Sequence, residues 1–318
     1  MINRTINHPA MFYYSNNRQP IPISAPIAKG GEGTIHELAG HPTKLVKVYS
    51  KPLTSLAQRK LQAMVSHRTL AGHRRLAWPE AVVLDAQGNV AGFVMKKVPG
   101  IPLVPLTALC LRSKELPHFT QFHLCRVVHD MAAGLDVLAK KRVYPGDISM
   151  NNFLMDPTTG EVSFIDCDSF QIPTGTGQAP FLCPVMTPEF QPPERLNRDA
   201  AATAITEAQV TFSMAILAFM VLTAGGHPYQ VYGGESPEAN IRAGRHFLGG
   251  KGCATGATTP EIFARYCSLS PWVMSLFKRT FIGGHLQPSE RPQLEEWIKA
   301  VKAFGQSLEF KAPSVATR

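Results

Sequence analysis

Residues 143–171, which read VYPGDISMNNFLMDPTTGEVSFIDCDSFQ, constrain the fold of this chain more than any other stretch. Two short apolar runs, at 153–155 and 162–165, flank the sequence DPTTG, in which Pro and Gly supply the backbone angles of a chain reversal. We therefore expect a β-hairpin, which brings the loops before and after it to the same end. Because Asp147, Asn152 and Asp166 lie in these loops, we expect their oxygen-bearing side chains to converge on one point.

A second informative stretch is the glycine-rich segment AKGGEGTIH at 28–36, which precedes the short strand pattern LVKVY. Glycines between strands let backbone N–H groups approach phosphate oxygens, although a plain hairpin turn would use the same residues. Lys47 lies in the middle of the apolar alternation that follows. A lysine at such a position either extends to the sheet edge or points into a cleft.

Hydrophobic periodicity predicts the remaining elements. Strands are expected at 21–28, 45–49, 81–85 and 90–96, and helices at 54–65, 121–139, 212–223, 271–281 and 293–304. Residues 1–20 show no period and are expected to be irregular. The sequence thus predicts an α+β chain, with most strands in the first third and most helices after it.

Composition excludes several classes of protein. The chain has 318 residues, of which 44% are hydrophobic and 17% charged, as in globular proteins of one large domain or two lobes. A net charge of +9 permits binding to nucleic acid, a membrane surface or nucleotide phosphates, but no run of basic residues or aromatic RNA-binding signature supports nucleic acid. The six cysteines lack metal-ligand spacing, no signal peptide is visible and no apolar run is long enough for a membrane span, so we expect a cytoplasmic protein.

The pattern D-x-x-x-x-N, followed by a strand, a turn and I-D-x-D, resembles the catalytic loop and metal-binding segment of the eukaryotic-like protein kinases. The sequence TPEFQPPE at 187–194 is similar to the kinase segment T-P-E-Y-x-A-P-E. The resemblance covers residues 28 to about 300. It implies a bilobal fold, with an antiparallel N-lobe sheet and one helix at 21–98, a mainly helical C-lobe at 99–306, an N-terminal arm at 1–20 and a C-terminal tail at 307–318.

The resemblance also assigns roles to individual residues. Asp147 would orient a substrate hydroxyl and accept its proton, Asn152 and Asp166 would hold Mg²⁺, and Lys47 would bind the inner phosphates of ATP. The expected nucleotide-binding residues are Ala28, Gly30, Gly31, Gly33, Ile35, Lys47, Met95, Lys97 and Leu154. By the same resemblance, Thr187 would contact Asp147, and Glu194 would form a buried pair with Arg291.

These roles imply ATP- and Mg²⁺-dependent transfer of a phosphoryl group to serine or threonine hydroxyls of a protein substrate. The chain is most similar to a bacterial branch of these kinases, on the sequences around Trp78-Pro79, Asp168-Ser169-Phe170 and Pro228-Tyr229. Members of that branch occur in tellurium-resistance-linked gene clusters. The resemblance therefore implies a PP2C-type phosphatase and a von Willebrand type A domain protein as partners.

The chain also departs from the kinase pattern, and the departures support a second hypothesis. Helix 54–65 has no glutamate to pair with Lys47, which leaves Gln58 or Gln62 as the nearest substitute, and further differences lie in the catalytic loop at Pro145-Gly146 and Ser149 and beyond it at Val210. They favour a nucleotide-binding pseudokinase that acts as a scaffold or switch.

Two further questions stay open at the level of sequence. A small-molecule phosphotransferase is a third hypothesis, because Gly-Asp in the catalytic loop also occurs in aminoglycoside-type kinases, whereas TPEFQPPE favours a protein substrate. Asp168 stands where the family has glycine. Its carboxylate either adds charge near the metal or forms bonds within its own segment.

Overall fold

The computed structural model describes residues 12–14, 16–175, 178–249 and 258–309. The chain divides into two compact units. The first, here called the sheet unit, consists of Met1–Val98 together with Ile165–Asp168. The second, here called the helical unit, consists of Pro99–Phe164 and Ser169–Arg318. The sheet unit therefore contains a short segment that is distant in sequence.

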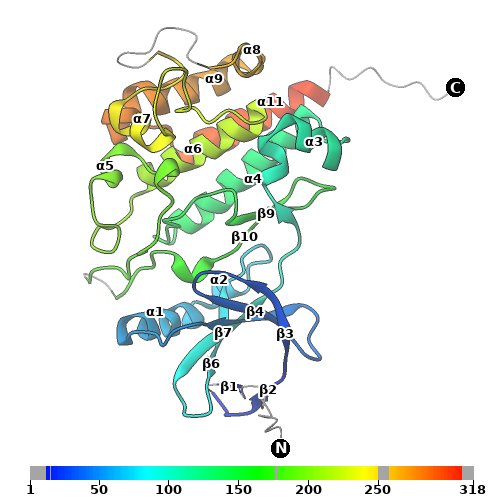
Figure 1. Cartoon of the computed structure of the whole chain (residues 1–318), viewed down its shortest axis with the longest axis vertical. Coiled ribbons are helices and arrows are strands. Elements are labelled where there is room, and N and C mark those ends of the chain that lie inside the picture. Colours follow the sequence, from blue (N-terminus) through cyan, green and yellow to red (C-terminus); the bar gives the residue numbers. More distant parts are fainter. Residues whose placement is uncertain (1–11, 15, 176–177, 250–257, 310–318) are drawn as a thin grey trace, which may run out of the picture. The chain divides into compact units, whose positions relative to one another are not determined.

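The sheet unit is built on a seven-stranded antiparallel sheet with the strand order β2-β1-β6-β7-β5-β4-β3 (Figure 1). Its strands are β1 (Phe12–Tyr14), β2 (Pro20–Ile21), β3 (Ile23–Lys29), β4 (Gly33–Leu38), β5 (Lys44–Tyr49), β6 (Pro79–Leu84) and β7 (Val90–Lys96). The strand that carries Lys47, β5, lies between β4 and β7. Its backbone is therefore held on both sides.

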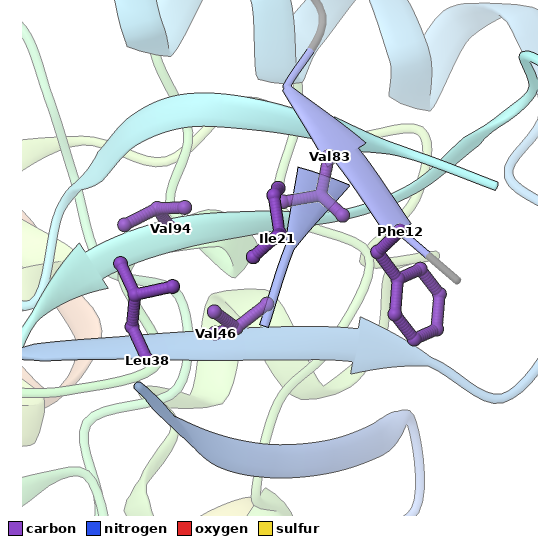
Figure 2. Close-up of a cluster of buried hydrophobic side chains, with 6 residues drawn as sticks. All are labelled: Phe12, Ile21, Leu38, Val46, Val83 and Val94. Atoms are coloured by element: carbon purple, nitrogen blue, oxygen red, sulfur yellow. The ribbon is translucent and has the colours of Figure 1, made fainter. Parts of the chain in front are cut away.

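One face of this sheet is closed by six buried apolar side chains, shown in Figure 2: Phe12, Ile21, Leu38, Val46, Val83 and Val94. The expectation of an irregular arm over residues 1–20 fails for Phe12–Tyr14, which form β1 between β2 and β6. The reason is burial, since Phe12 is 9% exposed and Ile21 4% exposed against the core. Neither side chain belongs to a run long enough to show a period.

The helices of the sheet unit are α1 (Ser55–Ser66) and α2 (Arg68–Ala71). The side chain of Thr54 accepts a hydrogen bond from the backbone N–H of Ala57 and so caps α1. Leu61 and Met64 form its buried face, and the indole N–H of Trp78 donates to the carbonyl of Met64 at 2.8 Å. These contacts fix α1 against the part of the chain that leads into β6.

The helical unit contains a small antiparallel sheet of β8 (Ile101–Pro102), β9 (Phe153–Met155) and β10 (Val162–Phe164), which includes the predicted hairpin. Its longer helices are α4 (Gln121–Ala139), α6 (Glu207–Thr223) and α11 (Leu294–Glu309). The shorter elements are η1 (Val104–Thr107), α3 (Leu109–Glu115), η2 (Cys167–Ser169, which begins in the sheet unit), η3 (Pro188–Phe190), α5 (Pro193–Leu196), α7 (Pro237–Ala243), α8 (Pro260–Cys267), α9 (Pro271–Lys278), η4 (Arg279–Gly283), α10 (Gly284–Leu286) and η5 (Pro288–Glu290).

Helices α4, α6 and α11 pack side by side in the helical unit (Figure 1). Nearly every residue of α6 is buried, which matches its apolar sequence. It begins at Glu207, five residues before the predicted start, because a capping box of Thr206 and Gln209 extends it. Helix α9 ends at Lys278, where a π-turn replaces the last residues of the predicted helix.

The predicted fold class is confirmed: an α+β chain with a seven-stranded antiparallel sheet in one unit and a mainly helical second unit. In the described part of the chain, Cys110, Cys125, Cys167, Cys183 and Cys267 form no disulfide. Across the same residues, we find no helix with the length and apolar character that crossing a membrane requires.

The helical unit contains a buried ion pair between Glu194 and Arg291. The two guanidinium N–H groups of Arg291 donate to both carboxylate oxygens of Glu194, at 2.7 and 2.9 Å. The same guanidinium donates to the carbonyls of Gly284 and Ala208 and lies 4.8 Å from the ring centre of Phe212. The Arg291 side chain is 0% exposed, so these acceptors replace its hydration completely.

A second buried polar group surrounds Tyr229, whose hydroxyl hydrogen-bonds to Nδ1 of His285 at 2.9 Å. His227, His246 and His285 are each less than 10% exposed. Burial lowers the pKa of His227 and of His246 to about 4, and it also lowers that of His285. His227 and His246 are therefore neutral in the folded protein at pH 6, where an exposed histidine is mostly protonated.

We predict that Arg291→Met lowers the free energy of unfolding by about 3–5 kcal/mol, because it leaves the carboxylate of Glu194 without its cation. The matched control is Arg279→Met. Arg279 also bonds a glutamate, Glu296, but its side chain is 44% exposed, and we expect a loss below about 1 kcal/mol. Urea unfolding of the variants measures both values, and equal losses would contradict the buried pair's role.

We predict that acid weakens the fold through the buried histidines. Their pKa values are lower in the folded state than the ordinary 6.5, so the unfolded chain binds more protons as the pH falls below 6.5. His227 and His246 should each lower the free energy of unfolding by about 2 kcal/mol between pH 7 and pH 5. Thermal unfolding from pH 7 to 5 measures this, and His246→Gln should show a smaller decrease than the unsubstituted protein. An identical decrease in both would refute the assignment to His246.

Candidate functional site

Lys47 lies at the centre of β5 and is buried, with 6% of its surface exposed. It pairs with Ile35 on β4 and with Phe93 on β7. Two glycines let these neighbours approach, because a Cβ at Gly33 would lie 2.1 Å from the carbonyl oxygen of Val48 and one at Gly92 would lie 2.0 Å from that of Lys47. The glycines at 33 and 92 therefore allow β4 and β7 to lie close to the backbone of β5.

The ammonium of Lys47 bonds three carboxylates. Nζ donates to Asp166 at 2.9 Å, to both oxygens of Asp168 at 3.0 and 2.8 Å, and to Glu32 at 3.2 Å. The hydroxyl of Tyr49, which lies two residues along the same strand, donates to Asp168 at 2.8 Å. All five residues belong to the sheet unit. They form what we call the lysine cluster.

Opposing effects set the ionisation of the lysine cluster. Burial lowers the pKa of Lys47, but Asp168 and Asp166 outweigh burial and leave that pKa above its ordinary value. Burial and the charge of Asp168 raise the pKa of the Asp166 carboxyl, although Lys47 acts against them. Burial, followed by Asp168, also raises the pKa of Tyr49. Lys47 is thus a cation and Tyr49 a neutral donor at physiological pH.

Neither glutamine of α1 fills the place of the missing glutamate. The amide of Gln58 donates to the carbonyl of Leu53, and Gln62 is exposed, so the hydrogen-bond partners of Lys47 are the three carboxylates. The proposal of a glutamine partner is thus wrong. The side chain of Asp168 is 5% exposed, and both of its oxygens accept hydrogen bonds from Lys47 or Tyr49 on β5 rather than from its own segment. Whether it also adds charge near a metal stays a prediction.

The glycine-rich segment forms the turn between β3 and β4, where the N–H of Gly30 donates to the carbonyl of Gly33. Gly30 and Gly31 are exposed, and a Cβ added to either would meet no atom within 4 Å. Neither has a positive φ. The fold therefore requires glycine at position 33, where β5 is close, but not at 30 and 31.

The other expected nucleotide-binding residues occupy different surroundings. Ala28 is exposed on β3 and pairs with Ile35, while Met95 is buried on β7. The backbone N–H of Lys97 donates to the carbonyl of Thr43 at 2.8 Å, so this N–H is engaged within the sheet unit and cannot also bind a base. Leu154 belongs to the helical unit, on β9 between β8 and β10.

In the helical unit, Asp147 accepts hydrogen bonds from two side chains. The hydroxyl of Thr187 donates to its Oδ1 at 2.6 Å, and the amide of Asn152 donates to its Oδ2 at 2.8 Å. The same amide also donates to the backbone carbonyl of Asp147 at 2.9 Å. The carboxylate is therefore held in one orientation by two residues that the sequence singled out. We call these three residues the aspartate cluster.

The loop that carries Asp147 is held by Gln191, a residue that sequence analysis did not identify. The amide of Gln191 donates to the carbonyl of Gly146 at 3.1 Å, and a Cβ at Gly146 would lie 2.5 Å from the sulfur of Cys183. A larger side chain at 146 therefore does not fit. Val210, one of the departures from the kinase pattern, is buried in α6. Only knowledge of the fold could have identified Gln191 as the brace.

A buried arginine also lies near the aspartate cluster. Arg195 follows the TPEFQPPE segment and is 1% exposed, and its Nε and Nη2 have no hydrogen-bond partner among the described residues. Burial lowers its pKa, while the nearby Cys183 and Asp147 act in the opposite direction. Sequence analysis did not identify this residue. Its position in the short helix α5, directly after Glu194, gave no signal of burial.

One group of carboxylates in the sheet unit and one amide in the helical unit offer oxygen ligands for a metal. Glu32, Asp166 and Asp168 each place one carboxylate oxygen within 4.8 Å of the others in the sheet unit. In the helical unit, Asn152 uses its amide nitrogen on Asp147, so its side-chain oxygen is the atom it could offer a cation. Oxygen donors of this kind suit Mg²⁺.

The structure thus brings Asp147 together with Asn152 and Thr187, and Lys47 together with Asp166. Asp166 belongs to the sheet unit and the other two polar loop residues to the helical unit. Convergence of Asp147, Asn152 and Asp166 on one point stays a prediction. Tyr49 was missed by sequence analysis, although its spacing of two residues from Lys47 places it on the same face of β5.

Comparison with curated proteins gives one informative similarity. The chain is 27% identical over 290 residues to proteins named "Protein kinase YegI" from Escherichia coli strain K12 and from Escherichia coli O157:H7. The alignment covers 89% of this chain and 44% of each relative, so the chain spans less than half their length. No protein-family model matches the chain. The similarity supports a bacterial protein-kinase-like family.

We predict that two neighbouring glycines respond differently to alanine. Gly33→Ala should lower the free energy of unfolding by about 2 kcal/mol or more, because the added Cβ meets the Val48 carbonyl. Gly31→Ala, the matched control, adds its Cβ to open space and should change stability by less than about 0.5 kcal/mol. Thermal unfolding of both variants is the measurement. Equal destabilisation would show that the close approach at Gly33 is not limiting.

Proposed function

We propose that this protein is an ATP- and Mg²⁺-dependent protein kinase that phosphorylates serine or threonine hydroxyls. The observation that carries the proposal is the lysine cluster, in which a buried strand lysine lies 2.9 Å from the aspartate of the I-D-x-D motif. A buried lysine beside acidic groups is the arrangement with which kinases hold the phosphates of ATP. Similarity to a named protein kinase supports the same activity.

In the proposed reaction, the substrate hydroxyl oxygen forms a bond to the γ-phosphorus of ATP. The bond between that phosphorus and the oxygen bridging to the β-phosphate breaks, so ADP leaves with the bonding electrons. Asp147 orients the hydroxyl and takes its proton. Thr187 and Asn152 hold the carboxylate of Asp147 in position, which is their role in the aspartate cluster.

The remaining residues bind the nucleotide. The turn at Gly30 and Gly31 leaves space for phosphate oxygens, because even an added Cβ at either position would meet no atom within 4 Å. The ammonium of Lys47 would contact the inner phosphates. Asp166 and Asn152 would hold Mg²⁺, which supplies positive charge that neutralises the transferring phosphoryl group.

The alternative is a pseudokinase that binds nucleotide and acts as a scaffold or switch. Its support is the environment of the catalytic loop, where Ser149 is buried in the place of the usual lysine. A protein substrate, rather than a small molecule, is favoured by the TPEFQPPE segment at 187–194. A PP2C-type phosphatase and a von Willebrand type A domain protein are proposed as partners on the resemblance alone.

We predict that the purified protein transfers label from γ-labelled ATP to itself or to a basic acceptor protein in the presence of Mg²⁺. Asp147→Asn should lower kcat by about 100-fold or more, because the proton acceptor is lost. Asp166→Ala and Lys47→Ala should remove detectable turnover. Phosphosite mapping by mass spectrometry identifies the hydroxyl that is modified.

The matched control for these variants is Asp136→Asn, since Asp136 pairs only with Lys140 on the surface of α4. It should retain full activity. Absence of labelling together with calorimetric binding of ATP would establish the pseudokinase. Absence of both labelling and binding would refute nucleotide chemistry altogether.

A further inference from the structure

The lysine cluster contains a carboxylate that the reaction above does not use. Asp166 is assigned to Mg²⁺ and Glu32 is half exposed, at 50% for its side chain, with the longest of the contacts to Lys47. Asp168 is the most buried acid of the three, at 5%, and makes the shortest contact with the ammonium. A buried carboxylate needs compensation, and here Lys47 and Tyr49 provide it.

We propose that Asp168 and Tyr49 are the positioning residues of Lys47, and that the orientation of the lysine therefore does not depend on helix α1. This inference rests on the proposed kinase function, and it names the regulation of the same site. Lys47 and Tyr49 project from one face of β5, and Asp168 lies in a segment of the same unit. The complete ion pair is therefore assembled without a side chain from α1.

The hydrogen bonds of Asp168 distinguish positioning from metal binding. Oδ1 accepts a bond from Lys47 at 3.0 Å, and Oδ2 accepts bonds from Lys47 at 2.8 Å and from Tyr49 at 2.8 Å. Asp166 accepts a hydrogen bond from Lys47 through Oδ1, and its side chain is 34% exposed. The more exposed carboxylate suits a hydrated Mg²⁺, and the enclosed one suits a protein cation.

The two donors at Asp168, Lys47 and Tyr49, have different roles. Tyr49 is neutral, because burial and Asp168 raise its pKa, so it adds a hydrogen bond without altering the net charge of the cluster. It thereby fixes one oxygen of Asp168 while Lys47 bonds both. A fixed carboxylate holds the ammonium in one place. The lysine is then oriented before any nucleotide contacts it.

The partner of Lys47, Asp168, lies outside helix α1, and this location has a consequence for how activity can be regulated. A kinase whose lysine pairs with a glutamate of a mobile helix loses activity when that helix moves away. In this chain, α1 bears no carboxylate, and its Gln58 and Gln62 do not contact Lys47. Displacement of α1 therefore does not remove the partner of Lys47. Control must act on the segment that carries Asp166 and Asp168, or on access of the substrate.

A double-mutant cycle on Lys47 and Asp168 tests this pairing without requiring activity. Asp168→Asn alone should lower the melting temperature, because it removes the main partner of a buried ammonium. In the Lys47→Met background, the same substitution should be neutral or stabilising, because it relieves repulsion among the remaining acids. An equal decrease in both backgrounds would overturn the pairing.

The kinetic arm uses the full chain with Asp168→Asn, Tyr49→Phe and the control Gln62→Ala. Asp168→Asn should lower kcat by about 100-fold and Tyr49→Phe by about 10-fold, while the Mg²⁺ concentration for half-maximal activity changes less than about twofold. Gln62→Ala should leave kcat unchanged. A large increase in the Mg²⁺ requirement of Asp168→Asn would make Asp168 a metal ligand, and a loss in Gln62→Ala would overturn independence from α1.

The two arms separate failure of this inference from failure of the proposed function. If the unsubstituted protein transfers no phosphate, the kinase proposal fails, yet the melting temperatures still report whether Asp168 and Lys47 are coupled. If the protein is active but the cycle is additive, the positioning role fails alone. The expected result is that Asp168→Asn lowers the melting temperature only when Lys47 is present, with the Mg²⁺ dependence changed less than about twofold.

Discussion

The burial of one ammonium group, that of Lys47, determines how the sheet unit must be built. The ammonium of a lysine side chain that is only 8% exposed requires anions within hydrogen-bond distance, and the chain supplies three, from the glycine turn and from residues 165–168. Close approach of β4 and β7 then requires glycine at 33 and at 92. The lysine thus links a local turn, two strand neighbours and a segment about 120 residues distant.

The helical unit meets a similar constraint with different partners. Arg291 is fully compensated by Glu194 and two carbonyls, which ties the TPEFQPPE segment to the region before α11. Arg195, next in sequence to Glu194, leaves Nε and Nη2 without a hydrogen-bond partner among the described residues, and Cys183 and Asp147 both act to raise its pKa. The charge of Arg291 therefore stabilises the fold, while the charge of Arg195 adds positive potential beside the aspartate cluster.

These electrostatic arrangements bear on how the departures from the kinase pattern are understood. Loss of the helix glutamate, taken alone, suggests a site that cannot orient its lysine. In the positioning role that we propose, the carboxylate of Asp168 would take the place of that glutamate, from another segment of the chain. The amide of Gln191 also braces the loop at Gly146. Compensation of this kind is a reason to test activity before assigning a scaffold role.

The sequence by itself determined the fold class, the hairpin at β9 and β10, and helix α4, because short-range periodicity and turn residues carry that information. The resemblance to protein kinases, rather than any period, led us to expect the Glu194–Arg291 pair and the contact of Thr187 with Asp147. Only tertiary structure decided that Phe12–Tyr14 form a strand, that Asp168 and Tyr49 enclose Lys47, and that Arg195 is buried. Each of these depends on contacts between residues far apart in the chain. Such contacts leave no periodic signal, since burial is decided by what packs from elsewhere.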